Sequence, residues 1–135
     1  MKAPIKTKSI RQTATFKASA KEVYEALMDE KKHAKFTRHP AKISRKVGGL
    51  FSAYRGYCLG VNLELVENKR IVQAWRGSDW PAEHLSTATF ALAKAPGGGT
   101  KLTFTQTGVP EKEYQDIKDG WRDYYWAPMK KFLEG

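Results

Sequence analysis

The sequence predicts an α+β fold in which one curved antiparallel sheet of about six or seven strands packs against a long C-terminal helix. Three observations predict it: a strand followed by two short helices, a run of strands separated by turn residues, and a strongly aromatic amphipathic segment near the C-terminus. Strands in succession with helices only at the ends are typical of an antiparallel sheet covered on one face. Because the chain has 135 residues and no repeat or linker, we expect one domain over residues 1–135.

The first third of the chain predicts a strand and two short helices. Lys6–Phe16 is rich in Thr, with Ile and Phe at alternating positions, which is typical of a strand. Ser19 and Glu22 have the spacing of a capping box, so a helix should begin there. A second short helix is expected over Asp29–Phe36, because Pro40 restricts the residue before it to extended backbone and stops the helix.

The middle of the chain predicts a succession of antiparallel strands. Alternating apolar residues bounded by Gly, Asn and Pro turns are typical of such strands. The segments that we expect to be strands are Ala41–Lys46, Leu50–Gly56, Leu59–Val66, Arg70–Gly77, Leu85–Ala93 and Lys101–Thr107.

The C-terminal segment 110–133 predicts a helix with one apolar face. Its apolar residues recur every three or four positions: Tyr114, Ile117, Trp121, Tyr124 or Tyr125, Pro128 and Phe132. Pro128 has no N–H to donate to the carbonyl oxygen of Tyr124, so we expect the helix to kink there or to restart as a second short helix. A helix this aromatic requires a broad apolar surface, and the sheet should provide it.

Positive charge is concentrated in the first third of the chain. The net charge is +10; residues 1–46 hold 13 Lys and Arg against 4 Asp and Glu, whereas residues 47–135 hold 11 against 10. Such a basic region is typical either of a solvated surface or of one that binds an acidic partner or nucleic acid. The cations are spread over a predicted strand and helix without interleaved exposed aromatics, which disfavours nucleic acid as the partner.

The residue types needed for catalysis or metal binding do not cluster in the sequence. Cys58 is the single cysteine, and the three histidines are widely separated, so neither a disulfide nor a metal or cofactor site is expected. No nucleophile–base pair is identifiable, which favours a non-catalytic protein. The chain also lacks a signal peptide and any apolar run of the ~18 residues that span a bilayer. We therefore expect a cytoplasmic protein without a membrane span.

Aromatic side chains are the strongest candidates for a binding site. Tyr and Trp combine an apolar ring with a polar atom, which suits the lining of a small-molecule pocket. The candidate lining between sheet and helix is Tyr54, Trp75, Trp80, His84, Trp121 and Tyr125, with Tyr124 as a close alternative to Tyr125. A fully packed core would use the same residues, so a filled interior and an open cavity both remain open interpretations.

Four segments together resemble a known superfamily. They are SAKEVYEAL at 19–27, VGGLFSAYRG at 47–56, LELVENKRIVQAWRG at 63–77 and WRDYYWAPMKKFL at 121–133. Their order and spacing resemble the SRPBCC (START-like, Bet v-like) superfamily of helix-grip folds. Trp80-Pro81, His84 and the segment GWRDYYWAPMK at 120–130 narrow the resemblance to the C-terminal-type domain of the activators of the heat-shock chaperone ATPase. The likeness covers about residues 9–133.

The resemblance implies a curved antiparallel sheet that grips the C-terminal helix, often around a hydrophobic cavity. It implies as a first function the binding of a small hydrophobic ligand in that cavity. The alternative is a protein-interaction module that binds a chaperone through the basic N-terminal region. Nucleic-acid binding by that region is a further alternative, and an enzyme acting in the cavity is the least supported.

Overall fold

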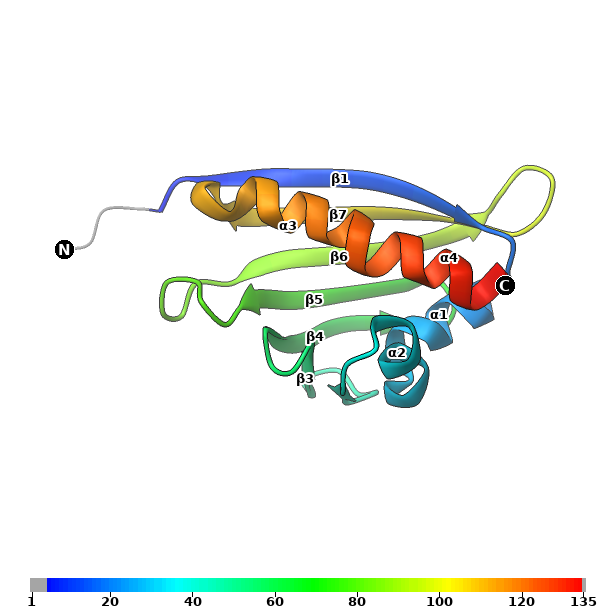
Figure 1. The fold of residues 1–135 in the computed structure, drawn as a ribbon, viewed down its shortest axis with the longest axis horizontal. Coiled ribbons are helices and arrows are strands. Elements are labelled where there is room, and N and C mark those ends of the chain that lie inside the picture. The colour runs from blue at the N-terminus through cyan, green and yellow to red at the C-terminus, as the bar shows by residue number, and fades with distance from the viewer. Residues whose placement is uncertain (1–4, 135) are drawn as a thin grey trace.

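Seven antiparallel strands form one open sheet in the computed structural model, which describes residues 5–134 (Figure 1). The strand order is β1-β7-β6-β5-β4-β3-β2, so the first and last strands in sequence are neighbours. The strands are β1 (Thr7–Phe16), β2 (Lys42–Ile43), β3 (Leu50–Ala53), β4 (Cys58–Val66), β5 (Arg70–Gly77), β6 (Ser86–Lys94) and β7 (Thr100–Pro110). The predicted α+β helix-grip fold is confirmed.

Helices cover one face of this sheet. They are α1 (Ala20–Met28), α2 (Glu30–Thr37), a 3₁₀ turn (Glu111–Glu113), α3 (Tyr114–Trp121), a π-helical turn (Arg122–Trp126) and α4 (Ala127–Glu134). The last four elements form one long rod that crosses the sheet diagonally, from the outer end of β1 toward α1 and α2 (Figure 1). The two short helices therefore close one end of the layer between rod and sheet, and the other end is left to the turns between strands.

The predicted N-terminal caps are present. The Glu22 backbone N–H donates to Ser19 Oγ, and the Ser19 N–H donates to the Glu22 carboxylate; each donor–acceptor distance is 3.1 Å. Asp29 then ends α1 and caps α2, because its carboxylate accepts the Lys32 N–H at 3.0 Å. Arg38 adopts left-handed backbone with φ of 62° and stops α2. Local sequence therefore decides where both short helices begin.

The C-terminal rod is interrupted before Pro128 rather than at it. The Ala127 N–H donates to the carbonyl oxygen of Arg122, five residues back, which inserts one extra residue into the helix. This π turn rotates the residues that follow it relative to the apolar face of α3. Tyr125 and Trp126 are therefore both buried, while Tyr124 is 61% exposed.

The core lies between the rod and the sheet, with Trp121 at its centre. The Trp121 ring lies 4.4 Å from Phe104 and 5.6 Å from Trp126, centroid to centroid. Its indole N–H donates to Gln106 Oε1 at 2.8 Å, and Gln106 is fully buried. A buried amide is costly unless it is hydrogen-bonded, so this pair stabilises the centre of the interface.

The apolar alternation of β4 falls on the outer face of the sheet. Leu59 is partly exposed and Leu63 is 48% exposed, whereas Cys58 and Asn62 are buried beneath the helices. A bulge between Asn62 and Glu64 then shifts the register, and Leu65 packs against the core. A period-two pattern specifies that a strand has two different faces, but not which of them the helices cover.

Candidate functional site

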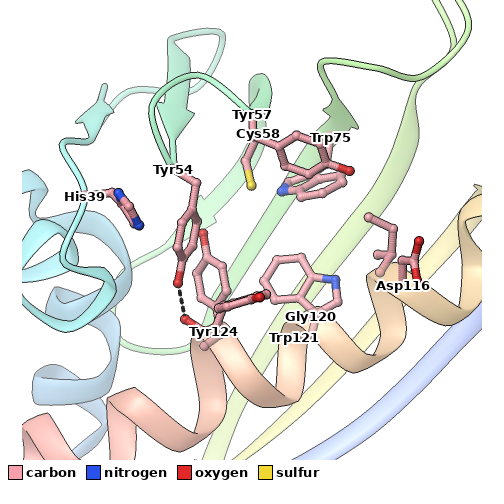
Figure 2. A pocket seen from close by; sticks show the side chains of 11 residues that line it. His39, Tyr54, Tyr57, Cys58, Trp75, Asp116, Gly120, Trp121 and Tyr124 are labelled. Carbon is pink, nitrogen blue, oxygen red and sulfur yellow. Dashed lines mark hydrogen bonds between the residues drawn. The ribbon is translucent and has the colours of Figure 1, made fainter.

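A pocket of about 430 Å³ opens between the C-terminal rod and the turn that joins β3 to β4 (Figure 2). Its lining is predominantly aromatic: His39, Tyr54, Tyr57, Cys58, Trp75, Asp116, Ile117, Gly120, Trp121, Tyr124 and Tyr125. Deeper in the core, behind Trp75 and Trp121, only about 20 Å³ remains unfilled. The interior is therefore packed toward α1 and hollow toward the strand turns. The volume of the open pocket lies in the range of small-molecule sites.

The turn after β3 holds one wall of the pocket in unusual backbone geometry. Tyr54, Arg55 and Gly56 have φ values of 50°, 56° and 86° in succession. Left-handed backbone costs a residue other than glycine about 1 kcal/mol or more, so this conformation needs compensation. Tyr54 supplies it: its hydroxyl donates to the carbonyl oxygen of Tyr124, and its ring lies 5.7 Å from that of Tyr125. The wall is thereby anchored to the rod.

A buried polar chain fixes the floor of the pocket. His33 Nδ1 lies 3.1 Å from the carbonyl oxygen of Leu27, and its Nε2 lies 3.1 Å from the Tyr125 hydroxyl. Burial lowers the pKa of His33 to about 4, so the ring is neutral near pH 7. Since a carbonyl can only accept, Nδ1 carries the proton, and Nε2 accepts from the Tyr125 O–H. The Cys58 thiol lies beside the Tyr125 hydroxyl.

The neighbouring polar side chains do not activate the Cys58 thiol. Burial raises the pKa of Cys58 to about 12. Burial likewise raises the pKa of Tyr125 well above its ordinary value. A thiol attacks as its thiolate, so Cys58 is a neutral, inert group at pH 7. The floor of the pocket is thus shaped by neutral side chains, of which His33 and Tyr125 are hydrogen-bonded to each other.

The mouth of the pocket carries negative charge. Asp116 lies on α3 at the rim and is exposed. On the opposite side, Tyr57 lies near Asp79 and Glu113; burial raises the pKa of its phenol above the ordinary range, and these carboxylates raise it further. Tyr57 therefore remains a neutral phenol at pH 7.

Four of the six predicted lining residues meet at this pocket: Tyr54, Trp75, Trp121 and Tyr125. Trp80 and His84 lie outside its lining. Trp80 packs on the far side of Trp75, with ring centroids 5.3 Å apart, and it borders a separate surface hollow. His84 Nε2 lies 2.8 Å from the carbonyl oxygen of Gly108. Both residues buttress Trp75 and the end of β7.

Sequence reasoning left out several groups that the fold brings to the pocket, among them His39, Cys58, Asp116 and Gly120. Asp116 and Gly120 are four residues apart and one residue before Ile117 and Trp121, so helical spacing could have placed them at the edge of the same stripe. His39 and Cys58 had no such signal. They enter the lining only because the β3–β4 turn and the end of α2 fold over the rod.

Within residues 5–134, no group of three or more His, Cys, Asp or Glu side chains is placed to hold a metal ion. None of the helices formed by these residues is long and apolar enough to cross a membrane.

Comparisons with known proteins identify the family of this fold and pocket. Residues 17–134 match the family model described as "Activator of Hsp90 ATPase homolog 1-like protein". The chain is 32% identical over 127 residues to "Activator of 90 kDa heat shock protein ATPase homolog 1" of Homo sapiens, which covers 94% of this chain and 37% of that protein. It is 30% identical over 130 residues to homolog 2 of Mus musculus, with 96% and 39% covered. The chain thus spans less than two fifths of the length of these relatives.

Solved structures agree with this assignment. An HSP90 activator from Plasmodium falciparum superposes with a TM-score of 0.87 and 25% identity, covering 93% of this chain and 96% of that one. The Aha1 dimer from Colwellia psychrerythraea has a TM-score of 0.81 at 20% identity, with 94% and 96% covered, and supports the fold alone. From the match to residues 17–134, the chain belongs to the family of Activator of Hsp90 ATPase homolog 1-like proteins.

Proposed function

We propose that this protein is a co-chaperone that binds an Hsp90-type chaperone and stimulates its ATPase activity. The observation that carries the proposal is the likeness to the Plasmodium falciparum protein described as an HSP90 activator. That likeness extends over 96% of the other chain. In that structure, nearly the whole chain of a protein described as an HSP90 activator is a domain of this size and fold.

A basic surface supports a role in binding an acidic partner. Exposed cations lie on α2, at its C-cap and on β2: Lys31, Lys32, Lys35, Arg38 and Lys42. We call them the basic corner. The two elements are tied together, because the Ile43 N–H donates to the Glu30 carboxylate at 2.8 Å. Within residues 5–134, no member of the basic corner takes part in an ion pair. Lys2, another cation of the basic N-terminal region, lies outside the described residues.

Unpaired surface cations of this kind act mainly on association. Complementary charge steers the encounter of two proteins and raises the rate of association, and salt screens the effect. We therefore expect the chaperone surface that meets the basic corner to be acidic, and binding to weaken as ionic strength rises.

The test is a chaperone ATPase assay with an excess of the purified chain at low and high salt. We expect stimulation at about 50 mM salt and much less at about 300 mM, where the Debye length has shortened to below ~8 Å. The triple variant Lys31→Glu/Lys32→Glu/Lys35→Glu should lose most of the stimulation at low salt. The matched control Lys94→Glu/Lys101→Glu/Lys112→Glu changes the net charge equally, away from the basic corner, and should retain the stimulation.

Two outcomes would overturn this assignment. The first is an ATPase rate that does not change when the chain is added at low salt, together with no detectable binding by calorimetry. The second is an equal loss in both triple variants, which would show that total charge matters and the basic corner does not. Circular dichroism of each variant confirms that the fold is retained, since all six positions are exposed.

The pocket favours a second function, the binding of a small hydrophobic ligand. A cavity of about 430 Å³ lined by aromatic rings is costly to leave filled with water and lies at the surface, where a ligand can enter. Native mass spectrometry of protein from its own host should show a reproducible added mass. In vitro, a neutral apolar dye such as N-phenyl-1-naphthylamine should gain fluorescence on binding.

Gly120 offers a variant that blocks the pocket without removing a packed side chain. A Cβ at this position would meet only Tyr124 Cδ2, at 3.7 Å, so Gly120→Leu can extend into the cavity. Gly120→Ala is the matched control, because it changes the backbone in the same way and adds little volume. Dye and host ligand bound equally by wild type and Gly120→Leu would contradict this location for the site.

A further inference from the structure

We propose that the pocket selects small ligands that carry a quaternary ammonium group on an apolar body. The proposal rests on the second function above, ligand binding in this pocket, and adds the chemical class of the ligand. Three features of the pocket support it: the rings of the lining, the charge at the mouth, and the absence of Lys and Arg from the lining within residues 5–134.

Six aromatic side chains surround the space: Tyr54, Tyr57, Trp75, Trp121, Tyr124 and Tyr125. They come from both sides of the pocket: from the β3–β4 turn and β5 on one side, and from the rod on the other (Figure 2). Neighbouring rings are tilted rather than parallel: Trp75 and Trp121 make an angle of 45°, and Tyr54 and Tyr124 make 63°. Such tilted walls present several ring faces to one enclosed group. The negative face of a ring attracts a cation within about 6 Å, and several faces together form a cage for alkylated ammonium.

The charges around the pocket favour the same class of ligand. Asp116 is an exposed carboxylate in the rim. Asp79 and Glu113 raise the pKa of Tyr57, but they line a separate hollow. The next acidic residues along the rod, Asp119 and Asp123, both form ion pairs with Arg122, whereas no ion pair within residues 5–134 involves Asp116. Asp116 therefore offers an uncompensated negative charge at the entrance.

Within residues 5–134, no lysine or arginine competes for this charge inside the pocket. The chain has 24 Lys and Arg residues, yet none of those in the described part, residues 5–134, lines the cavity. A fatty acid or another anionic lipid would have to bury its carboxylate against ring faces and Asp116 without a partner, which is costly. The lining thus disfavours anions despite the strongly basic surface elsewhere.

Alkylated ammonium fits better than a bare one. A primary ammonium is compact and strongly hydrated, so transfer into an aromatic pocket costs much of its hydration. Methyl groups weaken that hydration and add apolar surface that packs against the rings. The wall that receives the group is already ordered, because Tyr54 is hydrogen-bonded to the backbone of Tyr124 and Tyr125 to His33. A preformed wall lowers the entropy cost of binding.

The experiment compares three soluble probes of nearly equal shape: choline, its neutral carbon isostere 3,3-dimethylbutan-1-ol, and the anion 3,3-dimethylbutanoate. Binding is followed at pH 7.5 by tryptophan fluorescence and by NMR shifts of the indole N–H groups. We expect choline to bind with a Kd roughly tenfold lower than the neutral isostere, as several cation–π contacts would give. The anion should bind most weakly.

Variants separate the charge from the shape of the site. Asp116→Asn should raise the Kd for choline about threefold, as expected for an exposed charge, and leave the neutral isostere unchanged. The control Asp119→Asn lies one turn away and outside the lining, so it should change neither. Tyr124→Leu should reduce the preference for choline, whereas Tyr124→Phe, which keeps the ring, should preserve it.

The results distinguish this proposal from the one on which it rests. If choline binds no more tightly than its neutral isostere, the ammonium preference is overturned and the apolar pocket stands. If neither probe nor the apolar dye binds, the pocket proposal fails together with it. A preference for choline that persists in both Asp116→Asn and Tyr124→Leu would place the cation elsewhere and would also overturn the assignment.

Discussion

Tyr54 donates its hydroxyl to the carbonyl oxygen of Tyr124, seventy positions along the chain. In an unbroken α-helix this carbonyl would accept the N–H of residue 128, but that residue is Pro128 and has no N–H. The acceptor that proline leaves free is thus used by the turn after β3. The hydrogen bond to this free carbonyl holds the opposite wall of the pocket against the rod.

Removal of this hydrogen bond should loosen the strained turn. Tyr54→Phe keeps the ring but leaves the Tyr124 carbonyl without its donor, so the free energy of unfolding should fall by about 1 kcal/mol. The measurement is the urea unfolding midpoint at pH 7.5. Tyr124→Phe retains the backbone acceptor and should change stability by less than ~0.5 kcal/mol. Equal stability of Tyr54→Phe and wild type would contradict a structural role for the bond.

Trp121 should be the most costly single position on the rod. It is 3% exposed, contacts several rings and donates to buried Gln106, so Trp121→Ala should lower the free energy of unfolding by about 3–5 kcal/mol. Tyr124→Ala, three residues later and 61% exposed, should cost less than ~1 kcal/mol. Chemical denaturation of both variants checks the contrast. A near-native midpoint for Trp121→Ala would show that this indole is not part of the packed core.

Two glycines should respond in opposite directions to alanine. A Cβ on Gly60 would lie 1.9 Å from the carbonyl oxygen of Ala74 and 2.6 Å from the Phe51 ring, so Gly60→Ala should destabilise the sheet by roughly 2 kcal/mol. Gly120 lies in a helix with open space beside it, and Gly120→Ala should stabilise the protein by about 0.5–1 kcal/mol. Thermal and urea unfolding of both variants would reveal any reversal of these signs.

His33 should make the fold sensitive to mild acid. Burial lowers its pKa from 6.5 to about 4, so the unfolded chain binds the proton more readily than the folded one. The contribution of neutral His33 to stability is therefore complete above pH 6.5 and is lost as the pH falls from 6.5 toward 4. Between pH 7 and pH 5 the loss should be roughly 2 kcal/mol at ~1.4 kcal/mol per pKa unit.

Comparison with a variant isolates this effect from the carboxylates, which also titrate in acid. His33→Gln removes the titrating group, so its stability should fall by roughly 2 kcal/mol less than that of wild type over the same interval, whatever its absolute stability. Urea unfolding at several pH values provides the measurement. Parallel pH profiles for the two proteins would show that His33 is protonated with an ordinary pKa.

Local spacing in the sequence determines the start of the short helices and the existence of the C-terminal helix. The capping box of Ser19 and Glu22 and the stripe through Ile117 and Trp121 depend only on residues three or four apart. The same holds for Pro128, whose missing N–H follows from its identity. Such features are visible without the fold because the interactions that produce them lie within one turn of helix.

The pocket is predicted only in part. Tyr54, Trp75, Trp121 and Tyr125 could be proposed as lining because aromatic residues on inner faces meet between a sheet and its helix. Trp80 was equally plausible from its type, but it lies behind Trp75, since a loop sets its position. Aromatic identity therefore indicates that residues gather, but not which of them face the open space.

The tertiary structure alone decides the partners of groups far apart in the chain. It places Tyr54 on the Tyr124 carbonyl, brings Cys58 beside Tyr125, and sets Asp116 at the mouth of the pocket. It also turns the apolar side of β4 toward solvent, which the alternation of Leu59 and Leu63 leaves undetermined. The physical reason is that a repeat of two or of 3.6 residues specifies the faces of an element, whereas the packing of all elements together decides what each face meets.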